Sequence, residues 1–199
     1  MPLEVSSPQY ASLADVEREA LACERCALAS GRTQVVFGVG DPSADLMFVG
    51  EGPGEQEDLQ GEPFVGRAGQ LLTKLVEGIG RTRADVYIAN VVKCRPPGNR
   101  DPLPPEIDSC RPWLEAQLSL VQPRVVVTLG NFATKLLLET KEGITRLRGR
   151  EFPFGNTVLV PTLHPSAVLR SGGTALAQSR ADFVVVKRAL ARAAAEAGS

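Results

Sequence analysis

The sequence predicts an α/β fold, a three-layer αβα sandwich around a mostly parallel four-stranded sheet. Four short apolar runs, over residues 45–49, 86–92, 124–129 and 156–160, have the length and composition of buried strands. Segments with helical spacing of apolar residues alternate with these runs, an order typical of a parallel sheet covered by helices on both faces. We expect residues 1–199 to form a single domain, because the chain is long enough to bury one full core.

The first half of the chain is expected to begin with a loose arm over residues 1–10, which contain two prolines and little periodicity. Ser12 and Asp15 form a capping pair for a helix that would run to about residue 29 and carry the first two cysteines. The elements that follow are an extended piece or short strand over 33–37, the strand over 45–49, a loop over 61–66 and a helix over 68–77.

The second half contains a proline-rich loop over residues 94–105, with no helical or strand periodicity. A structureless loop of this length within a compact domain is usually functional. The other expected elements are helices over 106–120, 130–138 and 174–195, strands over 86–92, 124–129 and 156–160, and an extended arginine-rich piece over 144–154.

Four loops are expected to meet at one edge of the sheet, because ligands of open α/β sheets bind outside the carboxyl ends of the strands. These loops are residues 50–54, the proline-rich loop from residue 94, the turn at residues 130–131 and the segment 161–166. The order of the elements alone supports this expectation.

The glycine-rich loop Gly50–Gly54 follows the first core strand and is central to the predicted site. Glycine lets the backbone come close to a bound group, because no Cβ stands in the way. Glu55 stands where a dinucleotide-binding fingerprint has its third glycine. The carboxylates of Glu55, Glu57 and Asp58 would also repel a free phosphate. We therefore expect this loop to hold a neutral, flat group and a water.

Composition gives no sign of a nucleic-acid-binding protein, because the formal net charge is −1. Any polyanion would have to meet local basic patches. The N-terminus has no basic segment leading into an apolar one, so we expect no signal peptide. The most apolar region, residues 125–138, is interrupted by polar residues, which argues against a membrane span. We expect a cytoplasmic protein and a monomer.

The four cysteines have the pattern of a metal site. Cys23 and Cys26 form a C-x2-C pair, whereas Cys94 and Cys110 lie far downstream. Structural disulfides are disfavoured in a reducing cytosol, and a C-x2-C pair there is typical of metal or redox chemistry. Four unrelated buried thiols are the alternative, since cysteine is a common core residue. The spacing fits either zinc or a [4Fe–4S] cluster and does not separate the two.

Three residues beside the predicted strand ends have the properties of a pocket for a nucleobase. His164, the only histidine, follows the last strand; Asn90 is the one polar residue of an apolar strand; and Phe64 lies in the loop over 61–66. Each has a structural alternative, as a core histidine, a hydrogen-bonded core amide or an ordinary core ring. Together they offer an aromatic face and two polar groups, as enzymes that extrude a base require. Basic residues flanking this site could hold a nucleic-acid backbone: Lys93, Arg95, Arg100, Arg146, Arg148, Arg150 and Arg170.

At these motifs the sequence resembles the family 4 uracil-DNA glycosylases, the iron–sulfur branch of the uracil-DNA glycosylase superfamily. The resemblance covers nearly the whole chain, from Cys23 to about Arg170. It implies that the four cysteines hold a [4Fe–4S] cluster rather than zinc. The motifs that carry it are Gly50-Glu-Gly-Pro-Gly54 with Glu57-Asp58, Pro63-Phe-Val-Gly66, Asn90 with Lys93-Cys-Arg-Pro-Pro97, and His164-Pro-Ser166 with Leu169-Arg170.

The resemblance also implies a DNA-repair enzyme that removes uracil from single- or double-stranded DNA and leaves an abasic site. Phe64 would stack on the flipped uracil, and the Asn90 amide would accept a hydrogen bond from uracil N3–H and donate one to O4. His164 would stabilise negative charge on uracil O2 as the glycosidic bond breaks. Gly52 and Glu57 would line the base, with Glu57 on the C5 side, where it would exclude the methyl group of thymine.

DNA contacts are implied for the segment after the last strand. Ser166, Leu169 and Arg170 would press on the opened duplex and help fill the vacated stack. We expect Arg95, Arg100 and Arg148 to contact the DNA as well. These residues complete the predicted interface with uracil-containing DNA.

In the better-studied branch of the superfamily an aspartate handles the attacking water. Gly52 stands at that position here. We therefore expect Glu51 to orient the water. A related branch binds uracil-DNA covalently through a histidine in a loop that corresponds to residues 95–109; no histidine occurs there, so we expect turnover. The alternatives are a non-catalytic iron–sulfur module that binds DNA or carries electrons, and a hydrolase of free nucleosides. A non-catalytic module would not need Phe64, Asn90 and His164 together.

Overall fold

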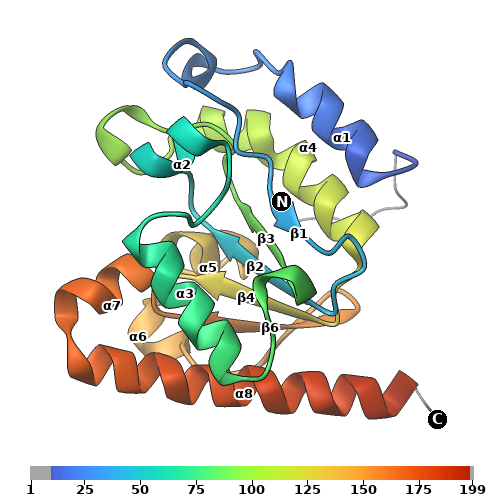
Figure 1. Cartoon of the computed structure of the whole chain (residues 1–199), viewed down its shortest axis with the longest axis vertical. Helices are drawn as coiled ribbons and strands as arrows, with labels where there is room; N and C mark the ends of the chain where they lie inside the picture. The colour runs from blue at the N-terminus through green and yellow to red at the C-terminus, as the bar shows by residue number, and fades with distance from the viewer. Residues whose placement is uncertain (1–9, 198–199) are drawn as a thin grey trace.

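Figure 1 shows the computed structural model of the chain, in which a six-stranded sheet lies between two layers of helices. The structure describes residues 10–197, so the predicted loose arm lies outside the described residues apart from Tyr10. The strands lie in the spatial order β1-β3-β2-β4-β6-β5. Their bounds are β1 (Val39–Gly40), β2 (Leu46–Gly50), β3 (Tyr87–Asn90), β4 (Val125–Leu129), β5 (Phe152–Phe154) and β6 (Thr157–Thr162).

The four inner strands, β3, β2, β4 and β6, run parallel, and both edge strands are antiparallel to their neighbours. The α/β class is confirmed, but the prediction of four strands is wrong, because two short edge strands complete the sheet. β1 has two residues, and a Cβ added at Gly40 would lie 1.8 Å from the carbonyl oxygen of Val86, so this pairing requires glycine. β5 contains Pro153, which strands tolerate at an edge.

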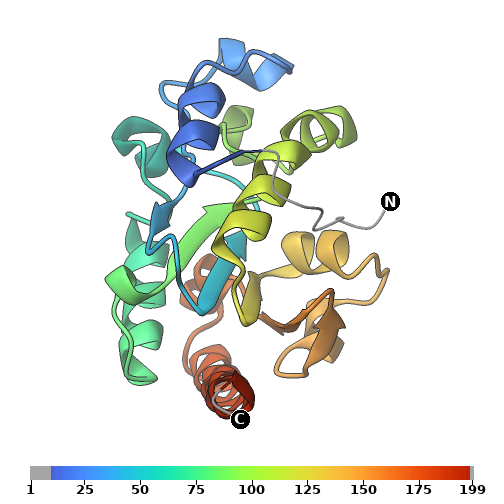
Figure 2. The same cartoon turned by 90° about the vertical axis from the view of Figure 1, so that its right-hand side faces the viewer.

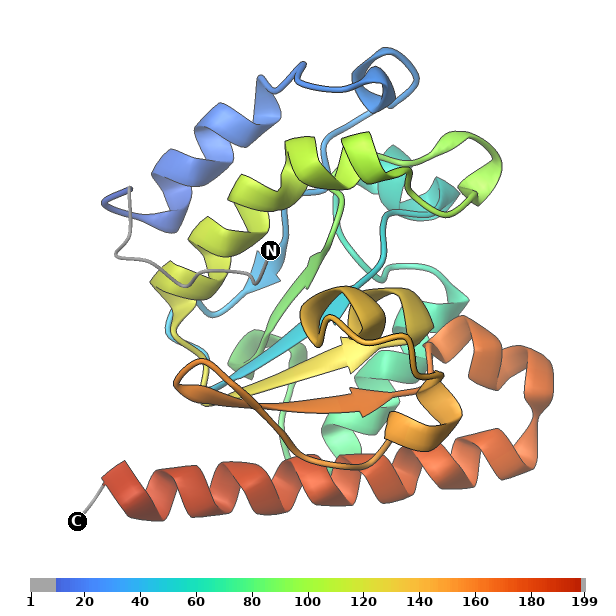
Figure 3. The same ribbon diagram turned by 180° about the vertical axis from the view of Figure 1, so that it is seen from behind.

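Helices cover both faces of the sheet. α1 (Leu13–Leu21), α4 (Pro104–Val121) and α5 (Asn131–Leu137) pack on one face, and α3 (Arg67–Gly78) and α8 (Gly173–Ala197) pack on the other. Figure 2 shows α8 nearly end-on below the sheet, and Figure 3 shows α1 and α4 on the opposite side of the sheet from α8. The short helices are α2 (Glu55–Gln60), α6 (Ile144–Leu147) and α7 (Pro165–Ser171). No helix within residues 10–197 is long and apolar enough to cross a membrane.

Strand β2 shows how the sequence builds this arrangement. Every one of its residues is buried, because helices lie on both faces of the strand. Successive side chains point to opposite faces, so Leu46 and Phe48 belong to the core beneath α3 and α8, whereas Met47 and Val49 belong to the core beneath α1 and α4. The ring of Phe48 stacks on that of Phe183 in α8, with centroids 5.7 Å apart.

Two predicted segments differ in the structure. The first helix ends at Leu21, so Cys23 and Cys26 lie in the following loop rather than on the helix. Charged, exposed residues interrupt the apolar spacing there, and the guanidinium of Arg25 lies 4.4 Å from the ring centroid of Trp113 in α4. The predicted extended piece over 144–154 contains the short helix α6 and the edge strand β5.

Candidate active site

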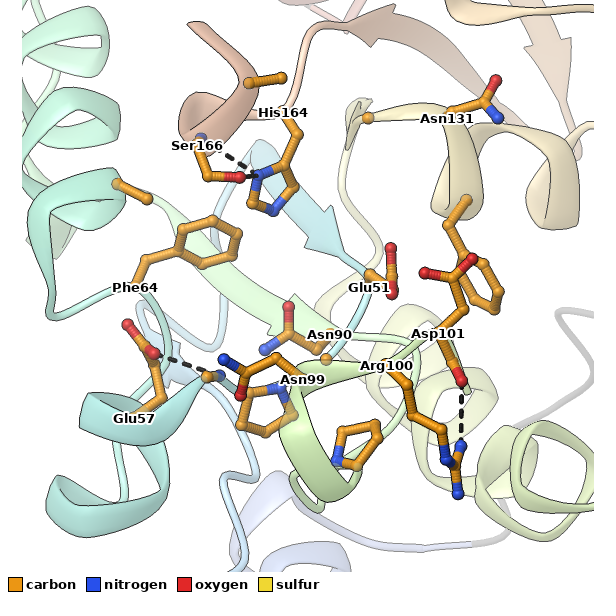
Figure 4. A pocket seen from close by; sticks show the side chains of 18 of the residues that line it. Glu51, Glu57, Phe64, Asn90, Asn99, Arg100, Asp101, Asn131, His164 and Ser166 are labelled. Carbon is orange, nitrogen blue, oxygen red and sulfur yellow. Dashed lines mark hydrogen bonds between the residues drawn. The ribbon is translucent and has the colours of Figure 1, made fainter. Parts of the chain in front are cut away.

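A cavity of about 1010 Å³ opens at the carboxyl ends of the parallel strands (Figure 4). The chain leaves β2 and continues to β3 on one side, whereas β4 lies on the other side of β2. Such a change of direction is where open α/β sheets bind ligands. All four expected loops contribute to the cavity wall, and the N-terminal turns of α2, α5 and α7 line it as well. The predicted residues among its lining are Glu51, Gly52, Glu57, Phe64, Asn90, Arg100, His164, Ser166 and Arg170.

Gly50, the last residue of β2, makes room for the two groups that would hold a base. A Cβ built on Gly50 would lie 2.3 Å from Asn90 Oδ1 and 2.7 Å from Phe64 Cζ. Both distances are far inside van der Waals contact, so any larger residue would displace the amide or the ring. Glycine is therefore required here by packing.

Asn90 ends β3, the neighbour of β2, and is almost completely buried. Within residues 10–197 its side-chain oxygen has no hydrogen-bond partner. A buried acceptor without a partner is costly, and such groups in native structures call for a reason. Figure 4 shows the amide directed into the cavity between Phe64 and Glu51. The Asn90 oxygen is thus an unpaired acceptor beside the cavity.

Phe64 lies in a loop that four hydrogen bonds hold in an uncommon conformation. Its φ is +55°, in the left-handed region that non-glycine residues rarely adopt. Arg83 donates hydrogen bonds to the carbonyl oxygens of Pro63 (2.9 Å) and Phe64 (3.3 Å). One carboxylate oxygen of Glu57 accepts from the backbone N–H groups of Val65 and Gly66. The Phe64 ring is thereby fixed beside the cavity.

Glu57 also joins the Phe64 loop to the glycine loop, because its second carboxylate oxygen accepts from the backbone N–H of Gly54 at 3.1 Å. Glu57 is the third residue of α2, a helix that the sequence analysis did not predict. A carboxylate in the first turn of a helix is favoured by the helix dipole. The residue lines the cavity, as expected, and additionally holds two of its walls together.

His164 faces Phe64 across the cavity, with ring centroids 5.8 Å apart. Its Nδ1 accepts a hydrogen bond from the backbone N–H of Ser166 at 3.2 Å and lies 2.7 Å from Ser166 Oγ. Because Nδ1 is the acceptor, the neutral ring carries its proton on Nε2. Burial, with a contribution from Arg170, lowers the pKa of His164 to about 4. At neutral pH His164 is therefore an uncharged donor.

Glu51, directly after β2, lies in the cavity beside Asp101 of the proline-rich loop. The two carboxyl groups lie beside each other there, close enough for the charge of Asp101 to act on Glu51. Burial, together with the neighbouring Asp101, raises the pKa of Glu51 to about 7. Glu51 can thus exchange a proton near neutral pH, as a general base must. Sequence analysis did not single out Asp101, because nothing in an aperiodic loop marks which residue turns toward the cavity.

The predicted DNA-contacting residues differ in how free they are. Leu169 and Arg170 lie exposed on α7. Arg95 donates a hydrogen bond to Asn99 at 2.8 Å. The guanidinium of Arg148 bonds to the buried carboxylate of Asp182 in α8, away from the cavity lining. Arg148 thus holds the last helix in place.

Two further predicted basic residues have structural partners. Both guanidinium Nη atoms of Arg100 pair with the carboxylate of Glu106, at 2.6 and 2.9 Å. The prediction that Lys93 holds a nucleic-acid backbone is wrong, because only 1% of the residue is exposed.

The four cysteines, all free thiols, line one small cavity between the loop after α1, the residues after β3 and helix α4. Two nitrogen donors point at the sulfurs: the backbone N–H of Lys93 at Cys110 Sγ (3.2 Å) and Arg32 Nη1 at Cys94 Sγ (3.5 Å). Within residues 10–197 no three ligating side chains lie close enough to hold a single metal ion. Four thiols around one cavity are a donor set that fits an iron–sulfur cluster, as the resemblance implies.

The chain is similar to proteins of one known family. A model of the uracil DNA glycosylase superfamily matches residues 37–190. A type-4 uracil-DNA glycosylase of Archaeoglobus fulgidus is 46% identical over 166 residues, which are 79% of this chain and 83% of the relative. One of Thermotoga maritima is 48% identical over 151 residues, covering 75% and 79%, and one of Sulfurisphaera tokodaii is 44% identical over 167 residues, covering 79% and 76%. The chain belongs to the type-4 family of the uracil-DNA glycosylase superfamily.

Membership of this superfamily confirms the resemblance that the motifs indicated. The part of the chain matched by the family model begins just before β1 and ends within α8, so it contains all six strands. It also contains Cys94 and Cys110, whereas Cys23 and Cys26 precede it. The N-terminal cysteine pair lies outside the matched part and packs against the core that α1 and α4 cover.

Proposed function

We propose that this protein is a DNA-repair enzyme, a uracil-DNA glycosylase that hydrolyses the N-glycosidic bond of uracil in single- or double-stranded DNA and leaves an abasic site. The observation that carries the proposal is the unpartnered Asn90 oxygen, buried in a cavity between an aromatic ring and a neutral histidine. Uracil in this cavity would pair N3–H with that oxygen. Its family membership supports the same conclusion.

Recognition of the base would use Phe64 and Asn90. The ring of Phe64 would stack on the flipped uracil, and the Asn90 amide would accept from N3–H and donate to O4. Glu57, on the cavity wall, would lie on the C5 side, where the methyl of thymine would meet it. The backbone of Gly52 would complete the wall on the water side.

The chemical step would use His164 and Glu51. As the bond between C1′ and N1 breaks, its electron pair stays on uracil, and the Nε2–H of His164 would stabilise the charge that develops on O2. A donor aimed at such a charge typically contributes about 10²–10³ in rate. A water oriented by Glu51 would attack C1′ and give its proton to the carboxylate.

Binding of DNA would use residues around the cavity mouth, of which Leu169 and Arg170 are exposed. Ser166, Leu169 and Arg170 of α7 would contact the opened strand, with Leu169 filling the space the base leaves. Arg95 and Arg100 would face the backbone from the proline-rich loop. Arg148 is left out of this set, because its guanidinium pairs with the buried Asp182 away from the cavity, whereas Arg100 lines the cavity.

Cys23, Cys26, Cys94 and Cys110 would hold a [4Fe–4S] cluster. These cysteines lie between α4, the loop after α1 and the residues after β3, so the cluster would connect the proline-rich loop to α1 and to the sheet. Binding of the cluster would thus keep the cavity wall in position. We also keep the monomeric state and the cytoplasmic location as predictions.

The test is excision from a uracil-containing oligonucleotide, read as alkali-labile strand cleavage, with a thymine-containing oligonucleotide as control. We expect cleavage at uracil alone. Asn90→Ala should reduce single-turnover excision by about 10²-fold. The matched control is Asn156→Ala, at an exposed turn residue between β5 and β6. No cleavage by protein that contains iron and sulfide, with intact DNA binding, would instead favour a non-catalytic iron–sulfur module.

A further inference from the structure

The position of Asp101 is fixed by its own loop rather than left to a flexible surface. Arg100 Nη1 donates to the carbonyl oxygen of Asp101 at 2.9 Å, and the same guanidinium forms a two-point ion pair with Glu106. Glu106 is buried and also accepts from the backbone N–H of Leu103 at 2.8 Å. These contacts hold the part of the proline-rich loop that precedes α4. The carboxyl group of Asp101 lies beside Glu51 in the cavity (Figure 4).

We propose that Asp101 is a positioning residue of the water-handling site, and that Glu51 and Asp101 act together as one base. Both residues line the cavity with their carboxyl groups side by side, so Asp101 sets the position of Glu51 and can accept a hydrogen bond from it once Glu51 has taken the proton that the attacking water loses. This inference rests on the proposed function, in which Glu51 orients that water. It assigns the proline-rich loop a part in the reaction itself.

Further charged or ionisable groups line the cavity around the pair. The other ionisable side chains that line the cavity are Glu57, Arg100, Lys135, His164 and Arg170. Glu57 accepts three backbone N–H groups, and the side chain of Arg100 pairs with Glu106. His164 is neutral at physiological pH.

Two carboxyl groups in such contact repel each other when both are ionised, so they hold a proton more tightly than either would alone. Burial and Asp101 together bring the pKa of Glu51 to about 7. A base of this strength is matched to neutral pH. Glutamate in water would be far weaker.

The C1′–N1 bond breaks with its electron pair on uracil N1, and the water oxygen bonds to C1′. The proton released by that water goes to the Glu51 carboxylate, and the protonated Glu51 then donates a hydrogen bond to the carboxylate of Asp101. The uracil anion leaves with O2 on the His164 donor and takes a proton from solvent, and the pair returns its own proton to solvent. No redox partner is needed.

Asp101→Asn tests the proposal, because it removes the charge and keeps the size. The single-turnover excision rate of the wild type should rise with pH, with a midpoint at about 7. In the variant we expect this midpoint to fall by about 1 unit, because Glu51 loses its negative neighbour. The rate on the plateau should fall about tenfold, because Glu51 becomes a weaker base. Asp108→Asn, on an exposed residue of α4, is the matched control.

A second measurement does not depend on activity. Side-chain carboxyl signals of 13C-labelled glutamate report the titration of Glu51 in both proteins, assigned with Glu51→Gln. A lower midpoint in Asp101→Asn supports the pair, and an unchanged midpoint in both measurements overturns it. If wild-type protein does not excise uracil, the proposed function fails, while the carboxyl titration still decides whether the two residues are coupled.

Discussion

Lys93 Nζ donates a hydrogen bond to the backbone carbonyl oxygen of Asn90 at 2.8 Å. The same ammonium group donates to Gln117 Oε1 in α4, and Gln117 Nε2 donates in turn to the carbonyl oxygen of Phe37 and the hydroxyl of Tyr87. Lys93 is almost completely buried. A buried polar network therefore fixes the end of β3, from which the Asn90 amide projects into the cavity.

Lys93→Met should loosen this end of the strand while keeping the length of the side chain. It leaves the Asn90 carbonyl and the Gln117 oxygen without their donor, and each buried unpaired group costs about 1–3 kcal/mol. We expect a fall of about 3 kcal/mol in the free energy of unfolding in urea, together with slower uracil excision. Lys187→Met, at an exposed site on α8, is the control. Equal stability of the two variants would contradict this account.

Glu57→Gln should weaken the connection between the glycine loop and the Phe64 loop. The carboxylate accepts three backbone N–H groups, whereas an amide would turn its own donors toward at least one of them. We expect a loss of about 2 kcal/mol in stability, since hydrogen bonds to charged groups contribute about 1.5–3 kcal/mol. Excision should also slow, because Phe64 is less well placed. The measurement is urea unfolding plus single-turnover kinetics, with exposed Glu77→Gln expected to match wild type.

Acid should destabilise the native state through His164. Burial lowers its pKa from 6.5 to about 4, so between these values the unfolded state binds a proton that the native state does not. The free energy of unfolding must then fall as the pH drops through this window. We expect His164→Gln to lose less stability between pH 7 and pH 5 than wild type, by about 2 kcal/mol. As His164 is the only histidine, the same pH dependence in both proteins would refute the buried, neutral state.

The sequence was sufficient to predict the inner sheet and the residues at its strand ends. Asn90 and His164 stand out because each is polar beside an apolar run, and parallel strands bring such ends to one edge. The two edge strands could not be predicted, because β1 has two residues and β5 contains a proline. Their pairing depends on the neighbouring strand more than on their own composition.

Long-range contacts explain why the sequence analysis misplaced Arg148 and did not single out Asp101. Arg148 looks like a surface arginine until Asp182, 34 positions later, is packed beside it. Asp101 turns toward Glu51 because the ion pair between Arg100 and Glu106 sets the path of an aperiodic loop. Local periodicity contains no information on either contact, so only the folded chain reveals them.

Two glycines of α3 give a matched test of how tightly the Phe64 loop is packed. A Cβ added at Gly69 would lie 1.6 Å from the carbonyl oxygen of Phe64, whereas one added at Gly78 would have no other atom within 4 Å. Both glycines lie in the same helix, where alanine is otherwise favoured by about 0.5–1 kcal/mol. We therefore expect Gly69→Ala to lower the free energy of unfolding and to impair excision, because the loop must move away from the cavity. Gly78→Ala should be neutral or slightly stabilising. Urea unfolding of both variants checks the contrast, and a harmless Gly69→Ala would show that the loop can shift without cost.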